Sequence, residues 1–261
     1  MAERFPAIFV SHGAPLLAIQ PGLAREFLSG LGKTLGKPKA ILAVSAHWES
    51  GDAAVSAAAQ PETIHDFYGF PDELYRIKYP APGAPGLAAR AQALLGEKGI
   101  AASAHATRGL DHGAWVPLML MYPDADIPVT QLTVQTALGP PHHFTLGEAL
   151  RGLRNKGVLI LGSGGATHNL REFGRHPDGA APPQWVTDFQ EWLAQTIESG
   201  QSDELVRYRS VAPDAVRNHP TEEHFLPLFV SAGAGSDGVA GKRIHRSHTF
   251  GIFAMDAYRF D

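Results

Sequence analysis

The sequence contains no cysteine among its 261 residues. This absence excludes disulfide bonds, thiolate metal ligands and a cysteine nucleophile, so any metal site must be built from histidine, aspartate or glutamate. Runs of basic residues are also absent, and 22 lysines and arginines stand against 26 acidic residues, a net charge of −4. Because binding to a phosphate backbone requires a basic stripe, a nucleic-acid partner is not expected.

Long apolar segments are missing as well. No stretch approaches the roughly 20 apolar residues of a membrane-spanning helix, and residues 1–6 lack the pattern of a leader peptide. We therefore expect no membrane partner and a cytoplasmic location. Hydrophobic residues make up 44% of the chain and charged residues 18%, as in ordinary globular proteins, and no linker divides the chain. These features predict a single domain over residues 1–261.

Three short apolar runs each lead within a few residues to a histidine. The histidines are His12, His47 and His168, and the runs before them are residues 7–10, 41–44 and 158–161. Such runs are typical of strands buried on both faces, and ligands of open α/β sheets bind at the carboxyl ends of these strands. Because neutral imidazole binds Fe, Zn and Cu ions, the pattern predicts a histidine-rich site for one metal ion.

Segments with helical spacing alternate with these strands. Helices are predicted over residues 23–35, 85–96, 116–122 and 184–199, and further strands near residue 100, over 128–134 and over 247–258. Thr145 and Glu148 have the spacing of a capping box for a helix ending near Gly157, and Thr221 is expected to cap a helix that contains His224. The prediction is an α/β domain with a central, mostly parallel or mixed sheet flanked by helices and a site at the carboxyl ends of the strands.

Residues 52–84 are rich in proline, glycine and aromatic residues and are interpreted as a long structured loop. Long loops in compact domains usually bind ligands or act as lids, so residues 61–83 are predicted to cover the mouth of the site. The alternative is a surface excursion with its own aromatic cluster. Residues 162–165 lack the ending of a phosphate-binding loop, and the adjacent His142 and His143 are interpreted as surface residues.

Six ordered blocks carry a resemblance that spans most of the chain. They are residues 11–15, 45–49, 66–71 with 79–83, 110–115, 162–165 with 168–169, and 219–220 with 224–228. In these blocks the chain resembles the class III extradiol dioxygenases, in particular the subgroup similar to 4,5-DOPA extradiol dioxygenase. The resemblance implies a single α/β catalytic domain that opens the ring of a DOPA-like catechol with dioxygen.

The resemblance also implies roles for individual histidines. It places His12, His47 and His224 on a divalent metal ion, His168 on the metal or in the role of acid/base, and His112 beside the substrate. We expect His168 to be the acid/base group, with His112 as the second candidate, because imidazole titrates near neutral pH.

The nature of the metal ion stays open at this point. Glu223 is a rival ligand to His224: two histidines with one carboxylate are typical of oxygen-activating Fe(II), whereas an all-histidine site also suits Zn(II). Fe(II) is the cofactor expected for ring opening. A zinc hydrolase with Glu49 or Glu223 as its base, and a non-catalytic metal-binding protein, are the alternatives.

The expected partners are a small catechol and O2. Four aromatic side chains are candidates for gripping a flat ring, although each is also explained by packing: Trp48, Phe67, Tyr68 and Phe70. Candidates for binding a carboxylate on the substrate are Arg76, Lys78 and Arg243.

Overall fold

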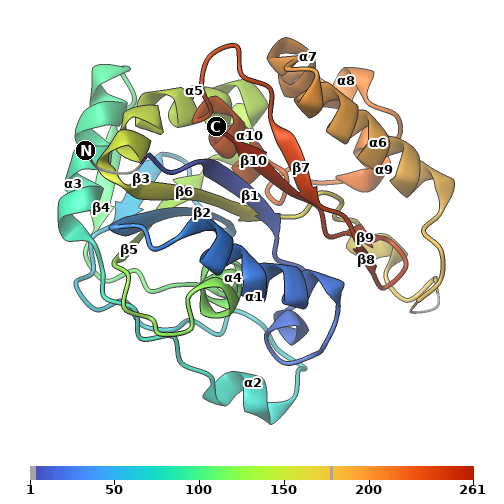
Figure 1. Ribbon diagram of the computed structural model, residues 1–261, viewed down its shortest axis with the longest axis horizontal. Helices are drawn as coiled ribbons and strands as arrows, with labels where there is room; N and C mark the ends of the chain where they lie inside the picture. Colours follow the sequence, from blue (N-terminus) through green and yellow to red (C-terminus); the bar gives the residue numbers. More distant parts are fainter. Residues whose placement is uncertain (1–3, 177–178) are drawn as a thin grey trace.

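The computed structural model describes residues 4–176 and 179–261. The strands of its main sheet are β1 (Ala7–Ser11), β2 (Ala40–Glu49), β3 (Ala53–Ser56), β4 (Ala102–His105), β5 (Val129–Val134), β6 (Val158–Gly164), β7 (Lys242–His245) and β10 (Ala257–Phe260). Within the described residues they form an eight-stranded sheet in the order β4-β3-β5-β2-β6-β1-β10-β7 (Figure 1). A separate hairpin pairs β8 (His248–Thr249) with β9 (Phe253–Ala254).

The centre of the sheet is parallel and its edges are mixed. β5, β2, β6 and β1 run parallel, whereas β3 pairs antiparallel with β5 and β10 pairs antiparallel with β1. The central strands are buried along almost their whole length, as expected for strands covered on both faces. The predicted α/β fold with a mostly parallel, mixed sheet is confirmed.

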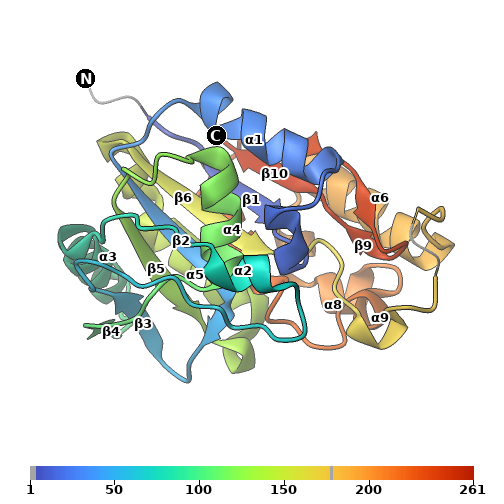
Figure 2. The same ribbon diagram turned by 90° about the horizontal axis from the view of Figure 1, so that it is seen from below.

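Helices cover both faces of this sheet. On one face lie α1 (Leu23–Leu35), α2 (Asp72–Arg76) and α4 (His112–Met121), and on the other lie α3 (Pro85–Glu97), α5 (Gly139–Leu150), α6 (Gln184–Glu198) and α10 (Leu226–Gly233) (Figure 2). Shorter helices are α7 (Ser202–Val206), α8 (Tyr208–Val211) and α9 (Ala215–Asn218), with 3₁₀ turns at Pro15–Ala18, Thr136–Leu138, Arg151–Lys156 and Leu170–Glu172. α4 is almost completely buried, because its residues are apolar around nearly the whole circumference of the helix.

The carboxyl ends of β1, β6 and β2 lie at the same edge of the sheet, with β6 between the other two. The register pairs Ser11 with Gly164 and Ser45 with Ser163. His12 follows β1 directly and its backbone N–H donates to the carbonyl oxygen of Gly164 at 2.9 Å. The topology therefore brings the segments that carry the predicted histidines to one place.

Two predicted helix starts are wrong. Thr145 lies inside α5, where its hydroxyl donates to the carbonyl oxygen of Pro141, since the helix already starts at Gly139 with prolines in its first turn. Thr221 does not cap a helix either, because its hydroxyl donates to Glu223, and α10 begins only at Leu226. His224 consequently lies in the turn that precedes α10.

Three further expectations need correction. His143 is fully buried on the inner face of α5, where its Nε2 accepts the N–H of Gln135 and its Nδ1–H donates to Gly139, so it is not a surface residue. Residues 52–84 contain β3 and α2 rather than only loop. Of residues 247–258, only the last part joins the main sheet, and the segment before it folds into the β8–β9 hairpin.

No helix of the described segments has both the length and the apolar character needed to cross a membrane. The cytoplasmic location stays a prediction.

Candidate active site

Three histidine rings converge beyond the carboxyl ends of β1 and β2. Nε2 of His47 lies 3.0 Å from Nε2 of His12 and 3.3 Å from Nε2 of His224. His12 and His224 are buried, and the side chain of His47 is 22% exposed. The structure thus brings together residues that are far apart in the sequence, such as His47 and His224, which are 177 positions apart.

Each of these rings has a hydrogen-bond acceptor near its other nitrogen. Nδ1 of His12 lies 3.0 Å from Oγ of Ser163, and the Ser163 hydroxyl donates to the carbonyl oxygen of Gly113, so the serine oxygen accepts the Nδ1–H of His12. Nδ1 of His224 lies 3.1 Å from Oε1 of Glu223. Nδ1 of His47 lies 3.5 Å from Oδ2 of Asp66. These hydrogen bonds assign the proton to Nδ1 of His12 and His224, and the charge of the Asp66 carboxylate favours the same tautomer of His47.

With the proton on Nδ1, each Nε2 directs a lone pair at the other two. Three neutral nitrogens that accept but do not donate have no hydrogen bond to share, whereas a cation placed between them satisfies all three. The donor set of three imidazoles suits Fe(II) and Zn(II). The residues therefore fit a divalent metal ion of this kind.

Electrostatics keeps the three rings in the neutral form that a metal requires. Burial, together with the neighbouring His112, lowers the pKa of His47 to about 4 against the opposing charges of Asp111 and Asp66. Burial and the neighbouring imidazoles lower the pKa of His12 and His224 well below the usual value of a histidine. Near neutral pH all three rings are uncharged and can bind a cation without first losing a proton.

The glycine-rich end of β6 explains how His224 reaches this point. A Cβ at Gly164 would overlap the carbonyl oxygen of His224, and a Cβ at Gly162 would overlap that of Pro227. The N–H of Gly165 donates to the carbonyl oxygen of His224 at 2.8 Å. The glycines therefore allow the turn before α10 to pack directly against the strand.

His168 and His112 flank the three converging rings. The ring of His168 stacks on that of His224 with centroids 3.5 Å apart, and burial lowers its pKa to about 4. The ring of His112 lies 3.9 Å from that of His47, and its Nδ1 lies 3.0 Å from Oδ2 of Asp66. His112 is the first residue of α4, whereas the sequence predicted that it precedes the helix.

Asp66 was given no role by the sequence analysis, although it lies in one of the blocks that carry the resemblance. Its Oδ1 accepts the backbone N–H of His112 at 2.9 Å, and its Oδ2 faces the Nδ1 atoms of both His112 and His47. Burial opposes ionisation of Asp66, but the hydrogen bonds and charge of His112, together with His47, outweigh it and lower its pKa to about 2. Asp66 is therefore ionised and orients two of the clustered histidines.

Asp111 supports the same region from behind. Its carboxylate is fully buried and accepts hydrogen bonds from Ser45 at 2.6 Å, Arg108 at 2.9 Å and Gln131 at 2.9 Å. It also caps α4 by accepting the N–H of Ala114. Ser45 lies two residues before His47 on β2. The hydrogen bonds of Asp111 therefore connect the start of α4 to the strand that carries His47.

A cavity of about 380 Å³ opens above the histidines and is lined by all five of them. Phe67 and Phe70, from the predicted covering loop, also line it. Trp48 and Tyr68 are not among its lining residues. Trp48 packs under the guanidinium of Arg108, 5.1 Å from the ring centre, and Tyr68 is 92% exposed.

Nearly the whole chain matches known proteins. A family model described as the catalytic LigB subunit of aromatic ring-opening dioxygenase matches residues 6–258. The chain is 45% identical to a protein of Beta vulgaris named 4,5-DOPA dioxygenase extradiol, over 97% of this chain and 95% of the relative. A protein of Escherichia coli K12 with the same name is 41% identical over 89% of this chain and 86% of the relative.

A solved structure of an uncharacterized protein from Escherichia coli K12 superposes with a TM-score of 0.83 at 32% identity, covering 99% of this chain and 100% of that one. The family model, the relatives and this structure agree with the resemblance drawn from the six blocks. The chain belongs to the LigB family of aromatic ring-opening, extradiol dioxygenases.

Proposed function

We propose that this protein cleaves the ring of a catechol next to its pair of hydroxyl groups, with O2 as the co-substrate and Fe(II) held by His12, His47 and His224. The observation that carries the proposal is the convergence of three Nε2 lone pairs at the floor of an apolar cavity. The name of the relative from Beta vulgaris specifies DOPA as its substrate. The site of this chain supports one part of that activity, the cleavage of a catechol ring.

Bound Fe(II) supplies a Lewis acid for the catechol oxygens and electrons for dioxygen. Because His12, His47 and His224 all line the cavity, a metal ion held by them would be accessible from it, and both reactants could meet there already oriented. Glu223 contacts Nδ1 of His224, on the side of the ring away from the converging Nε2 atoms. We propose it as the residue that orients His224 rather than as a ligand.

His168 is proposed to move protons. Its neutral ring lines the cavity and has a nitrogen lone pair with which to accept a proton from a catechol hydroxyl, and it returns that proton to the oxygen of the opened product. Asp66 lies 3.0 Å from Nδ1 of His112 and holds that ring at the cavity, where it can contact a catechol oxygen. Phe67 and Phe70 exclude water beside it.

Two alternatives are less well supported. A zinc hydrolase needs a carboxylate base at the substrate, but no aspartate or glutamate of the described residues lines the cavity. Glu49 accepts a hydrogen bond from Thr136 instead, and Glu223 is engaged by His224 and Thr221. A purely structural metal site does not explain an adjoining apolar cavity with two further histidines.

The test is oxygen uptake with a simple catechol after loading with Fe(II), together with the mass of the product. The proposal expects one O2 consumed per catechol and a product heavier by both oxygen atoms. Loading the same preparation with Zn(II) is the control, since zinc has no redox chemistry. Tight binding of Fe(II) without oxygen uptake on any catechol would refute the proposal.

A further inference from the structure

The cavity has a polar floor and an apolar wall. Its floor is formed by the five histidines, and the rest is lined mainly by apolar side chains. Apolar residues of this wall include Phe70, Leu170, Phe173, Phe250, Phe253 and Met255. If the hydroxyl groups of a catechol face the histidines, the substituent on the far side of its ring meets this apolar wall.

Three aromatic residues of this wall, Phe173, Phe250 and Phe253, form a connected group on the His168 side of the cavity. The ring centres of Phe173 and Phe250 are 5.2 Å apart, and Phe253 lies 6.3 Å from Phe250 and 6.1 Å from His168. Leu170 and Phe173 are 64% and 53% exposed, which places the rim of the wall at the surface. An apolar surface therefore runs from the floor to the mouth.

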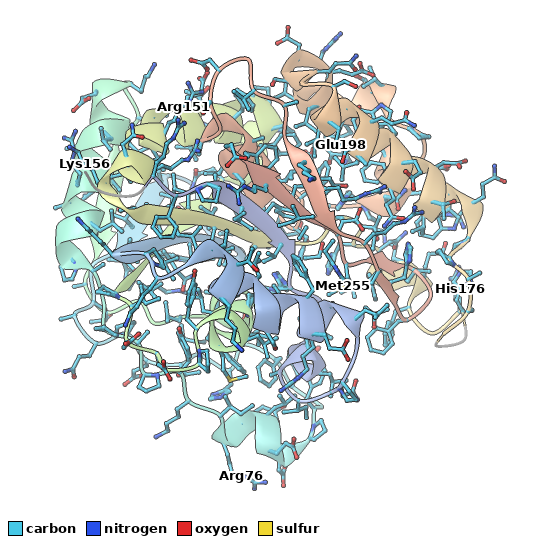
Figure 3. All side chains as sticks on the ribbon, in the orientation of Figure 1. Arg76, Arg151, Lys156, His176, Glu198 and Met255 are labelled. Atoms are coloured by element: carbon cyan, nitrogen blue, oxygen red, sulfur yellow. The ribbon has the colours of Figure 1, made fainter. Side chains whose placement is uncertain are left out.

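Charged partners for a substituent are missing from this surface. No lysine, arginine, aspartate or glutamate of the described residues lines the cavity. Among the candidates from the sequence, Arg76 is exposed and projects from α2 at the edge of the molecule, whereas Met255 lies near its middle (Figure 3). Lys78 is exposed and not among the lining residues, and Arg243 forms ion pairs with Glu191 and Asp256.

The two hydroxyl groups in the lining are also engaged. Ser11 donates to the carbonyl oxygen of Asp256 and accepts the N–H of Ala166. Thr167 donates to the carbonyl oxygen of Ile252 and accepts the N–H of Ala254. Neither is free to hold a carboxylate or an ammonium group, which would lose water on entry without gaining a partner.

We propose that the far end of this cavity accepts an uncharged, apolar substituent, so that the preferred substrates are alkyl- or aryl-substituted catechols rather than catechols with an amino-acid or carboxylate side chain. The inference rests on the proposed ring-cleaving function and narrows its substrate class. The proposed substrates differ from DOPA, a zwitterionic catechol, which the names of two relatives specify.

The first experiment compares kcat/KM for 4-methyl-, 4-ethyl- and 4-propylcatechol with 3-(3,4-dihydroxyphenyl)propanoate and L-DOPA. Burial of each added methylene is expected to raise kcat/KM about fourfold. The propanoate matches 4-propylcatechol in length but ends in a carboxylate, and we expect it and L-DOPA to be at least roughly tenfold poorer. Equal or better turnover of the charged compounds would overturn the inference.

A charge introduced at the rim gives a second test. Leu170→Arg places a cation at an exposed lining position, and it should raise the ratio of propanoate to 4-propylcatechol kcat/KM about two- to fivefold, the strength of an exposed ion pair. Leu138→Arg is the matched control, because Leu138 is 51% exposed and lies outside the cavity lining. An unchanged ratio in Leu170→Arg, or the same change in both variants, would contradict the assigned position of the substituent.

Calorimetric binding under nitrogen separates this inference from the proposed function. The Fe(II)-loaded protein could bind the series in the predicted order without cleaving any catechol. That result would refute the proposed ring cleavage but support the preference for apolar substituents. Longer alkyl groups should then give a more negative heat-capacity change, the mark of buried apolar surface. If charged compounds bind as well as 4-propylcatechol, the inference fails whether or not any ring is opened.

Discussion

Gly113 offers a sharp test of how closely the start of α4 packs on the histidine cluster. A Cβ built at this position would lie 2.9 Å from Cδ2 of His47 and 3.1 Å from Cε1 of His12, and would overlap Oγ of Ser45. Gly113→Ala therefore forces at least one of these groups to move by several tenths of an ångström. Oγ of Ser45 is the closest of these atoms and is held by a 2.6 Å hydrogen bond to Asp111, so the added methyl group disturbs this hydrogen bond as well as the two imidazoles.

Two opposing effects determine the stability of Gly113→Ala. Alanine favours a helix over glycine by up to about 1 kcal/mol. Overpacking of a buried site costs about 1–3 kcal/mol. We expect the second effect to prevail and the free energy of unfolding to fall by about 1–2 kcal/mol. Displaced ligands should also weaken binding of Fe(II) or Zn(II) by about 10- to 100-fold, as for other changes that misorient metal ligands.

The assay combines urea unfolding of the metal-free protein with metal competition against a chelator. Gly86→Ala is the matched control, because Gly86 is also the second residue of its helix, α3, and an added Cβ there meets no atom within 4 Å. The control should keep its metal affinity and lose no stability. If Gly113→Ala binds metal as tightly as Gly86→Ala, the packing argument is wrong.

Three further predictions concern the same fold and site. His12→Ala should lose both metal and turnover, whereas His168→Ala should keep most of its metal and lose ring opening by about 10²- to 10⁴-fold; parallel loss of metal from His168→Ala, measured on the same sample, would make it a ligand. Phe67→Ala should reduce catechol turnover, whereas Tyr68→Ala, 92% exposed, should not; equal effects would contradict the assignment of the cavity wall. Burial lowers the pKa of His143 to about 4, so the unfolded chain binds a proton there that the folded chain excludes, and stability is kept above pH 6.5 and lost as the pH falls toward 4. His143→Gln should therefore reduce the fall in unfolding free energy between pH 7.5 and 5 by about 2 kcal/mol, and an unchanged fall would count against this assignment.

Local patterns in the sequence predicted the repeated elements well. The helix predicted over residues 23–35 coincides with α1, and the strand over 128–134 nearly coincides with β5. In both cases the pattern of apolar residues that predicts the element lies within one short stretch of the sequence. The failed helix caps at Thr145 and Thr221 show the limit of such signals. A cap acts only where the backbone starts a helix, and in the folded chain these helices start at Gly139 and Leu226.

The sequence by itself determined the alternation of strands and helices, the absence of thiol chemistry and the set of histidines available for a site. The resemblance implied which histidines share a site, but the three-dimensional fold alone decided how closely their Nε2 atoms approach, how Ser163 and Glu223 set the tautomers of His12 and His224, and that no charged side chain of the described residues lines the cavity wall. The physical reason is the distance in sequence over which each property is decided. The periodicity of neighbouring residues indicates which of them are buried. The geometry of a metal site depends instead on distances of a few ångström between segments such as β2 and the turn at His224, where His47 and His224 are 177 residues apart. Those distances follow from how the glycine-rich end of β6 and the start of α4 pack, which no local pattern encodes.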